Sequence, residues 1–159
     1  MLVPLKYIPK RLSRKDKAVI SKELKKSRKL YKSGQYYKRK SVSSYPHRKS
    51  SHLSKAKQIY NINNLFVTKE LSLKTNCSLK GLDEIVKKGE GAYYSSGSRP
   101  NQTPQSWGYA RLASALTGGK SSVVDFSIIN EECDHNSIPY NLALKAKQIK
   151  RRHTRKTRI

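Results

Sequence analysis

The charge of this chain is concentrated at its two ends, and this limits which residues can form a packed core. The 159 residues carry a formal net charge of +25. Residues 1–58 hold 19 basic and 2 acidic residues, residues 59–142 hold 8 of each, and residues 143–159 hold 8 basic residues and no acidic one. Spreading so much charge over a small globule would cause strong self-repulsion. The sequence therefore predicts a neutral compact domain at 59–142 between a basic N-terminal arm and a basic C-terminal tail.

The composition points to an anionic partner. Lysine and arginine in such numbers suit nucleic acid or an acidic protein surface inside an assembly. No run of eighteen apolar residues is present, so no membrane span is predicted, and residues 1–6 lack the charge order of a signal peptide. The two cysteines, Cys77 and Cys133, have no histidine at zinc-finger spacing. We expect reduced thiols, although a bridge between them is possible, and we predict no metal or cofactor.

The first part of the N-terminal arm combines an apolar segment with a helix. Residues 1–12 are rich in apolar side chains and contain two prolines, so we expect them to be extended. They would lie in a groove of a neighbour or of this protein's own domain. Ser13 is a typical N-cap, and Asp16 three residues later completes a capping-box pattern. These residues predict one helix near 13–33, which Gly34 ends.

The second part of the arm, residues 35–58, interleaves basic and aromatic side chains and has little that could form a core. This composition suits phosphate contacts combined with base stacking, which favours nucleic acid. An extended arm packed on protein, with tyrosines in shallow pockets and solvated lysines, explains it equally well. Both interpretations stay open. The residues expected to contact a partner here are Tyr36, Tyr37, Lys38, Arg39, Lys40, Arg48 and Lys49.

The neutral domain begins with the pattern of a helical hairpin. Thr68 is the expected N-cap of a helix over residues 69–75, and Ser78 is that of a helix over residues 79–88. Asn76 between them can adopt the left-handed turn conformation. The spacing resembles a helix-turn-helix motif, but any tight helical hairpin needs the same pattern. Two carboxylates on the second helix also disfavour the reading of a DNA groove.

A long ordered loop is predicted at residues 89–103. Gly89 and Gly91 are expected to end the preceding helix, and Thr103 is expected to cap the next one. The loop matches neither a phosphate-binding P-loop nor a dinucleotide fingerprint. We therefore interpret it as a packing or docking loop rather than a small-ligand site. The residues expected to contact a partner at this loop are Tyr93, Tyr94, Arg99, Trp107 and Arg111.

Two further helices complete the predicted domain, at residues 104–116 and 123–129. Arg111 and Asp125 are candidates for a structural ion pair, since no second group positioned for acid–base chemistry is evident. The fold class is therefore mainly α: a small helical domain made of an αα-hairpin, an ordered Gly/Ser/Pro loop and two further helices, with long basic N- and C-terminal arms. The candidate contact residues of the C-terminal tail are Lys150, Arg151, Arg152, Arg155 and Arg158.

Several of these motifs together resemble a known domain family. The motifs are residues 7–10, 12–16, 24–29, 34–37, 85–100, 106–107, 110–112 and 117–120, and Asp125. They look like an uncharacterised domain family of nucleocytoplasmic large DNA viruses of algae and protists, with shorter relatives in tailed phages. The family has no known function and supplies no catalytic residues. What the resemblance implies is a viral setting.

The resemblance and the charge pattern together predict a structural virion protein. We expect a minor capsid, cement-like protein whose basic arms thread between neighbouring subunits, located in the virion and, during assembly, in the host cytoplasm or nucleus. Its partners would be other capsid proteins in a large assembly, with DNA or RNA as a further candidate partner of the arms. The alternative is a nucleic-acid-binding protein, either a viral DNA-condensing protein or a ribosomal-type RNA binder. No enzyme is predicted, because catalysis would need Arg99, Tyr93 or Tyr94, and Asp125 to converge in a pocket.

Overall fold

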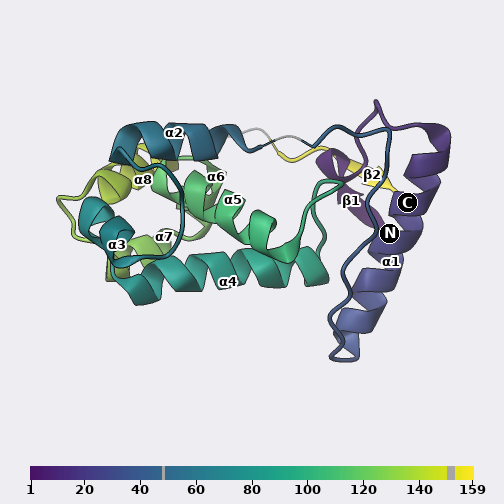
Figure 1. Ribbon diagram of the computed structural model, residues 1–159, viewed down its shortest axis with the longest axis horizontal. Coiled ribbons are helices and arrows are strands. Elements are labelled where there is room, and N and C mark those ends of the chain that lie inside the picture. The colour runs from purple at the N-terminus through teal and green to yellow at the C-terminus, as the bar shows by residue number, and fades with distance from the viewer. Residues whose placement is uncertain (48, 150–152) are drawn as a thin grey trace. The chain divides into compact units, whose positions relative to one another are not determined.

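The computed structural model describes residues 1–47, 49–149 and 153–159 and is mainly helical, as predicted (Figure 1). No helix in these residues is both long and apolar enough to cross a membrane. The elements in chain order are β1 (Leu2–Pro4), the 3-10 helix η1 (Leu5–Tyr7), α1 (Arg14–Lys32), α2 (Ser51–Tyr60), α3 (Lys69–Thr75), α4 (Leu79–Ser95), α5 (Pro104–Leu116), α6 (Lys120–Val124), α7 (Phe126–Glu132), α8 (Ile138–Gln148) and β2 (Lys156–Arg158).

The chain divides into two compact units. Unit 1 comprises Met1–Arg48, Glu90–Trp107 and Arg152–Ile159, and unit 2 comprises Lys49–Gly89 and Gly108–Arg151. This division differs from the predicted arm, central domain and tail. Both ends of the chain belong to one unit, which also contains most of the predicted central loop.

In unit 1 the two ends of the chain pair with each other. Strands β1 and β2 are antiparallel, with Val3 opposite Thr157 (Figure 1). The N–H of Ile159 donates to the carbonyl of Met1 at 2.9 Å. Val3 is fully buried and packs with the apolar side chains of η1 and α1. The terminal segments are thus basic, as expected, but they are folded onto their own chain and do not extend from it as arms.

Helix α1 forms where the sequence predicts it. The hydroxyl of Ser13 accepts a hydrogen bond from the N–H of Asp16 at 3.1 Å, which satisfies one donor of the first turn. Ile20 and Leu24 lie on the buried side of the helix. Gly34 follows with a φ of +78°, a conformation that favours glycine, and reverses the chain.

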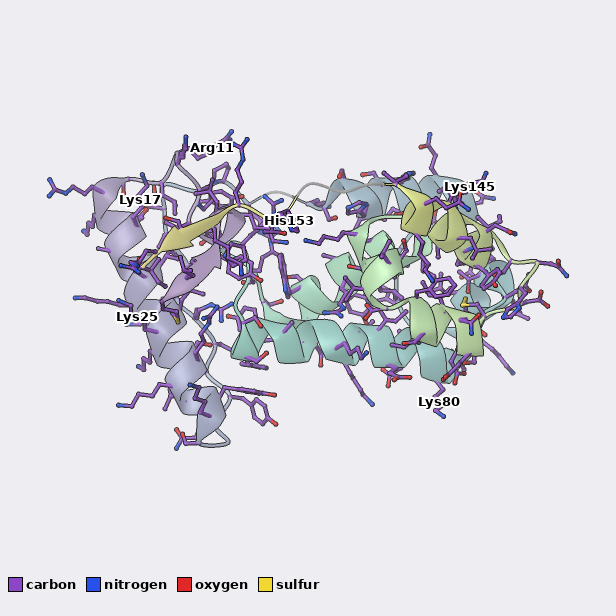
Figure 2. The ribbon with its side chains drawn as sticks, turned by 180° about the vertical axis from the view of Figure 1, so that it is seen from behind. Arg11, Lys17, Lys25, Lys80, Lys145 and His153 are labelled. Carbon is purple, nitrogen blue, oxygen red and sulfur yellow. A yellow bond between two sulfur atoms is a disulfide. The ribbon has the colours of Figure 1, made fainter. Side chains whose placement is uncertain are left out.

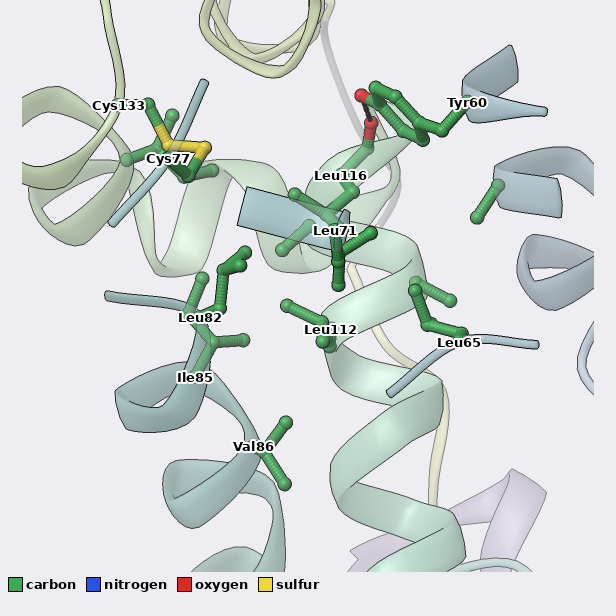
Figure 3. Close-up of a cluster of buried hydrophobic side chains, with 14 of the residues drawn as sticks. Tyr60, Leu65, Leu71, Cys77, Leu82, Ile85, Val86, Leu112, Leu116 and Cys133 are labelled. Atoms are coloured by element: carbon green, nitrogen blue, oxygen red, sulfur yellow. Dashed lines mark hydrogen bonds between the residues drawn. A yellow bond between two sulfur atoms is a disulfide. The ribbon is translucent and has the colours of Figure 1, made fainter. Parts of the chain in front are cut away.

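In unit 2 the structure has a helix that the sequence did not predict. Most of helix α2 falls within residues 35–58, which were interpreted as part of an arm with little that could form a core. It begins after the N-cap Ser50, whose hydroxyl accepts from the N–H of His52 at 3.2 Å, and it ends at Asn61 in the left-handed conformation. Tyr60 is buried and donates a hydrogen bond to the carbonyl of Leu116 (Figure 3). This burial raises the pKa of the Tyr60 hydroxyl.

The predicted helical hairpin is present as α3 and the start of α4. Thr68 caps α3 by accepting from the N–H of Leu71 at 3.2 Å, and Asn76 has a φ of +53°. The hydroxyl of Ser78 accepts from the N–H of Gly81 at 3.0 Å. The expectation of reduced thiols is wrong. Cys77 forms a disulfide with Cys133 beside the buried leucines of this unit (Figure 3).

Helix α4 continues through the first part of the predicted loop and ends only at Ser95. Gly89 does not end it, contrary to the prediction. A Cβ at this position would lie 2.6 Å from the Cα of Gly108 in α5, so glycine allows the two helix backbones to approach closely. The residue that follows the helix in a conformation favouring glycine is Gly97, with a φ of +121°.

The remaining helices of unit 2 follow the prediction in part. Helix α5 begins and ends where expected, and the hydroxyl of Thr103 accepts from the N–H of Ser106 at 3.0 Å. The single helix expected at residues 123–129 is instead two short ones, α6 and α7, on either side of Asp125. Helix α8 follows, capped by Ser137. It joins the end of the predicted neutral domain to the start of the predicted basic C-terminal tail.

Candidate functional site

The surface feature that most suggests a binding site is a group of exposed basic side chains on α1. Lys25 extends outward from this helix in Figure 2. Among the described residues of unit 1, α1 is the longest helix and supplies the longest regular surface. We call the exposed basic residues of α1 the α1 cationic face, and they are Arg14, Lys15, Lys22, Lys25, Lys26, Lys29 and Lys32.

Both carboxylates of α1 point away from this face and bind the chain's own groups. Asp16 accepts a hydrogen bond from the N–H of Ser44 at 2.9 Å, and the hydrogen bonds from Ser44 lower the pKa of its carboxyl. Glu23 accepts from the N–H of Lys40 at 2.9 Å and from the hydroxyl of Tyr37 at 3.0 Å. Each carboxylate therefore anchors the segment after α1, residues 37–44, and the α1 cationic face has no carboxylate of its own helix to neutralise it.

Arg39 is the residue that joins this segment to the end of α4. Its guanidinium donates to the carbonyl of Tyr93 at 2.6 Å and to the hydroxyls of Ser27 at 3.0 Å and Ser98 at 2.7 Å. It also lies 3.7 Å from the centroid of the Tyr93 ring, a cation–π contact. Burial lowers the pKa of Arg39. Arg39 was expected to contact a partner, but in this structure it links parts of unit 1.

The predicted loop residues have different surroundings. Tyr93 is buried, and its hydroxyl accepts from the backbone N–H of Arg39 at 2.9 Å. Arg99 is exposed, so the arginine that organises this region is Arg39 rather than Arg99. Trp107 packs edge-on against Tyr7, with ring centroids 6.2 Å apart. All of these residues belong to unit 1.

Arg111 belongs to unit 2 and forms the ion pair that the sequence predicted. Its guanidinium donates to both carboxylate oxygens of Asp125, at 2.7 and 2.8 Å, and Asp125 is fully buried. The Nζ of Lys88 lies 3.9 Å from the same carboxylate. Two cations around one buried carboxylate hold α4, α5 and the junction of α6 with α7 together. In the described residues, no group of three or more His, Cys, Asp or Glu side chains could hold a metal ion.

The comparison with family models gives one match, which covers residues 4–136 and therefore most of both units. The model is described as a family of unknown function (DUF5824). The chain belongs to this family. A search of curated proteins and a search of solved structures give no match. The DUF5824 match includes the α1 cationic face and the Arg39 contacts, whereas α8 and β2 lie outside it.

The other predicted contact residues lie mostly at the surface. Lys38, Lys40 and Arg155 are exposed, and Arg158 is exposed on β2, where it pairs with Leu2. Tyr36, Tyr37 and Tyr94 form ring contacts within unit 1. Lys49 is exposed at the start of unit 2. Four predicted residues lie outside the described part of the chain: Arg48, Lys150, Arg151 and Arg152.

The sequence analysis missed the polar residues that hold unit 1 together. Asn101 is the clearest case: its side-chain N–H groups donate to the carbonyls of Val42 and Tyr45, and its oxygen accepts from the N–H of Val42. The backbone of Asn101 has a φ of +59°, in the left-handed region. Asparagine after Pro100 is a turn signal, and that signal was available in the sequence. The partners of Asn101 could not be predicted from the sequence, because they lie 56 and 59 positions away.

Proposed function

We propose that this chain binds nucleic acid through the α1 cationic face, holding the phosphate backbone without reading base sequence. The observation that carries the proposal is the arrangement of α1. Its basic side chains are exposed, while both of its carboxylates are turned inward and used by the chain's own backbone. Lysines and arginines displayed in this way bind phosphates and release counterions.

The distribution of charge between the units supports the same assignment. Unit 1 contains 21 basic and 3 acidic residues, and unit 2 contains 14 basic and 7 acidic residues. Several acidic residues of unit 2 pair with lysines on the surface, among them Glu70 with Lys74 and Asp83 with Lys87. Unit 1 is therefore the stronger source of positive potential, and an anionic polymer is expected to bind there.

The test replaces three lysines in each unit. Lys22, Lys25 and Lys29 follow helical spacing on one side of α1, and the first variant changes all three to Gln. The control variant changes three exposed lysines of unit 2 to Gln, namely Lys69, Lys80 and Lys145, two of which are labelled in Figure 2. Both variants have the same net charge. Binding to a labelled oligonucleotide is measured by fluorescence anisotropy over a series of salt concentrations.

The proposal predicts that only the α1 variant lowers the salt dependence of binding. Loss of three phosphate contacts should reduce the slope of log K against log salt by about 2 to 3. Equal losses in the two variants would mean that net charge alone attracts the nucleic acid. The absence of binding by the unaltered protein at low salt would contradict the proposal outright.

A structural role in a virion is the second proposal, and the apolar surface of unit 2 favours it. Leu73 is 75% exposed, and Val124 and Phe66 are also more than half exposed. Side chains of this kind suit contacts with neighbouring protein subunits. In this role the protein is a minor capsid component, and the α1 cationic face pairs with acidic protein or packaged DNA. Nuclease and stepped salt applied to purified particles test it, because a capsid component stays with the shell after the genome is removed.

A further inference from the structure

Three tyrosines form a partly open cluster at the C-terminal end of α1. The ring of Tyr36 is central: its centroid lies 6.1 Å from that of Tyr31 and 5.1 Å from that of Tyr94. Tyr36 is 72% exposed and Tyr31 is 37% exposed, so a large aromatic surface faces solvent. We call Tyr31, Tyr36 and Tyr94 the tyrosine cluster.

The cluster is held in place before any ligand arrives. Gly34 reverses the chain after α1, and the N–H of Gln35 donates to the carbonyl of Leu30 at 2.9 Å, which returns Tyr36 to the end of the helix. The next residue, Tyr37, is fixed by its hydrogen bond to Glu23. The loss of side-chain freedom on binding is therefore small, and this favours a binding role over simple exposure.

Three exposed lysines are close to the cluster in the sequence. Lys29 and Lys32 belong to the last turn of α1, and Lys38 follows two residues after Tyr36; all three are exposed. The carboxylate of Glu90 is also near. Burial raises the pKa of the Tyr94 hydroxyl, and electrostatic interactions with Tyr93 and Glu90 raise it further. The balance of charge around Tyr36 still favours an anion with a flat, stackable group.

We propose that the tyrosine cluster stacks an unpaired base while the neighbouring lysines hold the phosphates, so that the protein prefers single-stranded to double-stranded nucleic acid. This inference rests on the proposed nucleic-acid binding and adds the class of ligand. In a duplex the faces of the bases are stacked on each other and cannot reach Tyr36. In a single strand the faces of the bases are accessible. Proteins that bind single strands commonly combine aromatic side chains, which stack on the bases, with a basic surface, which contacts the phosphates.

The experiment changes the ring and leaves the charge alone. Tyr36→Ala removes the aromatic surface, and Tyr36→Phe keeps it. Neither variant alters the net charge, and the exposure of Tyr36 means that both should fold, which circular dichroism checks. Binding is measured with one oligonucleotide as a single strand and as a duplex, with 2-aminopurine as the base that reports stacking by loss of its fluorescence.

The inference predicts that Tyr36→Ala weakens single-strand binding by about 5- to 100-fold, abolishes the fluorescence quenching and leaves duplex binding unchanged. Tyr36→Phe should behave like the unaltered protein. If Tyr36→Ala binds both forms as tightly as before, the stacking inference is overturned while nucleic-acid binding stands. If the unaltered protein binds neither form, both proposals fail. The remaining explanation of the α1 cationic face would then be that it binds acidic proteins and no nucleic acid.

Discussion

The two units of this chain are stabilised in different ways. Among the described residues, the hydrophobic cluster of unit 2 contains 17 buried residues, including the two cysteines of the disulfide, whereas that of unit 1 contains 8. Unit 1 is built from three separate stretches of chain. The hydrogen bonds of Arg39 and Asn101 join residues 1–48 to residues 90–107, and the pairing of β1 with β2 joins the two ends of the chain. The unit with the basic surface therefore depends more on partly buried hydrogen bonds between distant segments, and the other unit depends more on apolar packing and the disulfide.

This difference has a functional consequence. In unit 1, Arg39 and Glu23 bond to the chain's own groups, whereas the lysines of the α1 cationic face are exposed, so the proposed binding would use residues other than those that hold the fold. A substitution of Arg39 or Glu23 should therefore destabilise unit 1, and a substitution of an exposed lysine should affect only the binding of nucleic acid. Unit 2 should respond to neither.

The largest expected effect is the loss of the disulfide. The bridge between Cys77 and Cys133 spans 56 positions, and replacing both cysteines by serine should destabilise unit 2 by about 4 kcal/mol because the unfolded chain gains freedom. Far-UV circular dichroism reports the helices of both units, most of whose residues belong to unit 2, and the fluorescence of Trp107, the single tryptophan, follows unit 1. An equal shift of both transitions would show that the two units do not differ as described.

The next largest effect is expected at Arg39. Changing Arg39 to Met removes three hydrogen bonds to the groups around Tyr93 and should cost unit 1 about 3 kcal/mol. Arg39→Lys keeps the charge but loses the forked geometry, so it should recover only part of the stability. Denaturant unfolding followed by Trp107 fluorescence measures both. Full recovery with lysine would mean that charge, and not the hydrogen-bond pattern, holds the segment.

A smaller effect is expected from two glycines of α4. Gly89→Ala would place a methyl group against the backbone of Gly108 and should destabilise the protein by about 1 to 2 kcal/mol. Gly91→Ala is the matched control, because nothing lies within 4 Å of its Cβ position, and alanine should stabilise the helix by about 0.5 to 1 kcal/mol. Thermal unfolding of the two variants should shift in opposite directions. A shift in the same direction would contradict the close approach of α4 and α5.

The smallest effect is a dependence on acid at Asp16. Hydrogen bonds from Ser44 lower the pKa of Asp16 in the folded protein. Its stabilisation is therefore fully present above the ordinary aspartate pKa of about 4 and is lost as the pH falls through the lowered value. Asp16→Asn should lower the melting temperature of unit 1 at neutral pH and have little effect in strong acid. An effect that is the same at both pH values would exclude this role for the carboxylate.

The sequence was most informative where one residue controls the local backbone. Ser13, Thr68, Ser78 and Thr103 were each predicted as helix caps, and each side chain accepts the expected backbone hydrogen bond. The pairing of Arg111 with Asp125 was also predicted. These features depend on the chemistry of a side chain and its near neighbours, or on two charges of opposite sign in the neutral domain.

The errors arose where the structure depends on distant contacts. Gly89 looks like a helix end in the sequence, and only the approach of α5 explains why glycine lies within a helix. Helix α2 has few apolar residues, and its burial comes from Ala56 and Tyr60 against the rest of unit 2. The partners of Arg39 lie up to 59 positions away. Spacing in the sequence could not reveal them, nor the pairing of the two cysteines.

The central claim is that unit 1 binds nucleic acid through the α1 cationic face and the tyrosine cluster. The most direct measurement is a titration of the isotope-labelled full chain with a short single-stranded oligonucleotide, followed by amide chemical shifts. We expect shifts concentrated in α1 and in residues 29–38, with α6, α7 and α8 of unit 2 largely unaffected. Shifts confined to unit 2, or no shifts at low salt, would contradict it.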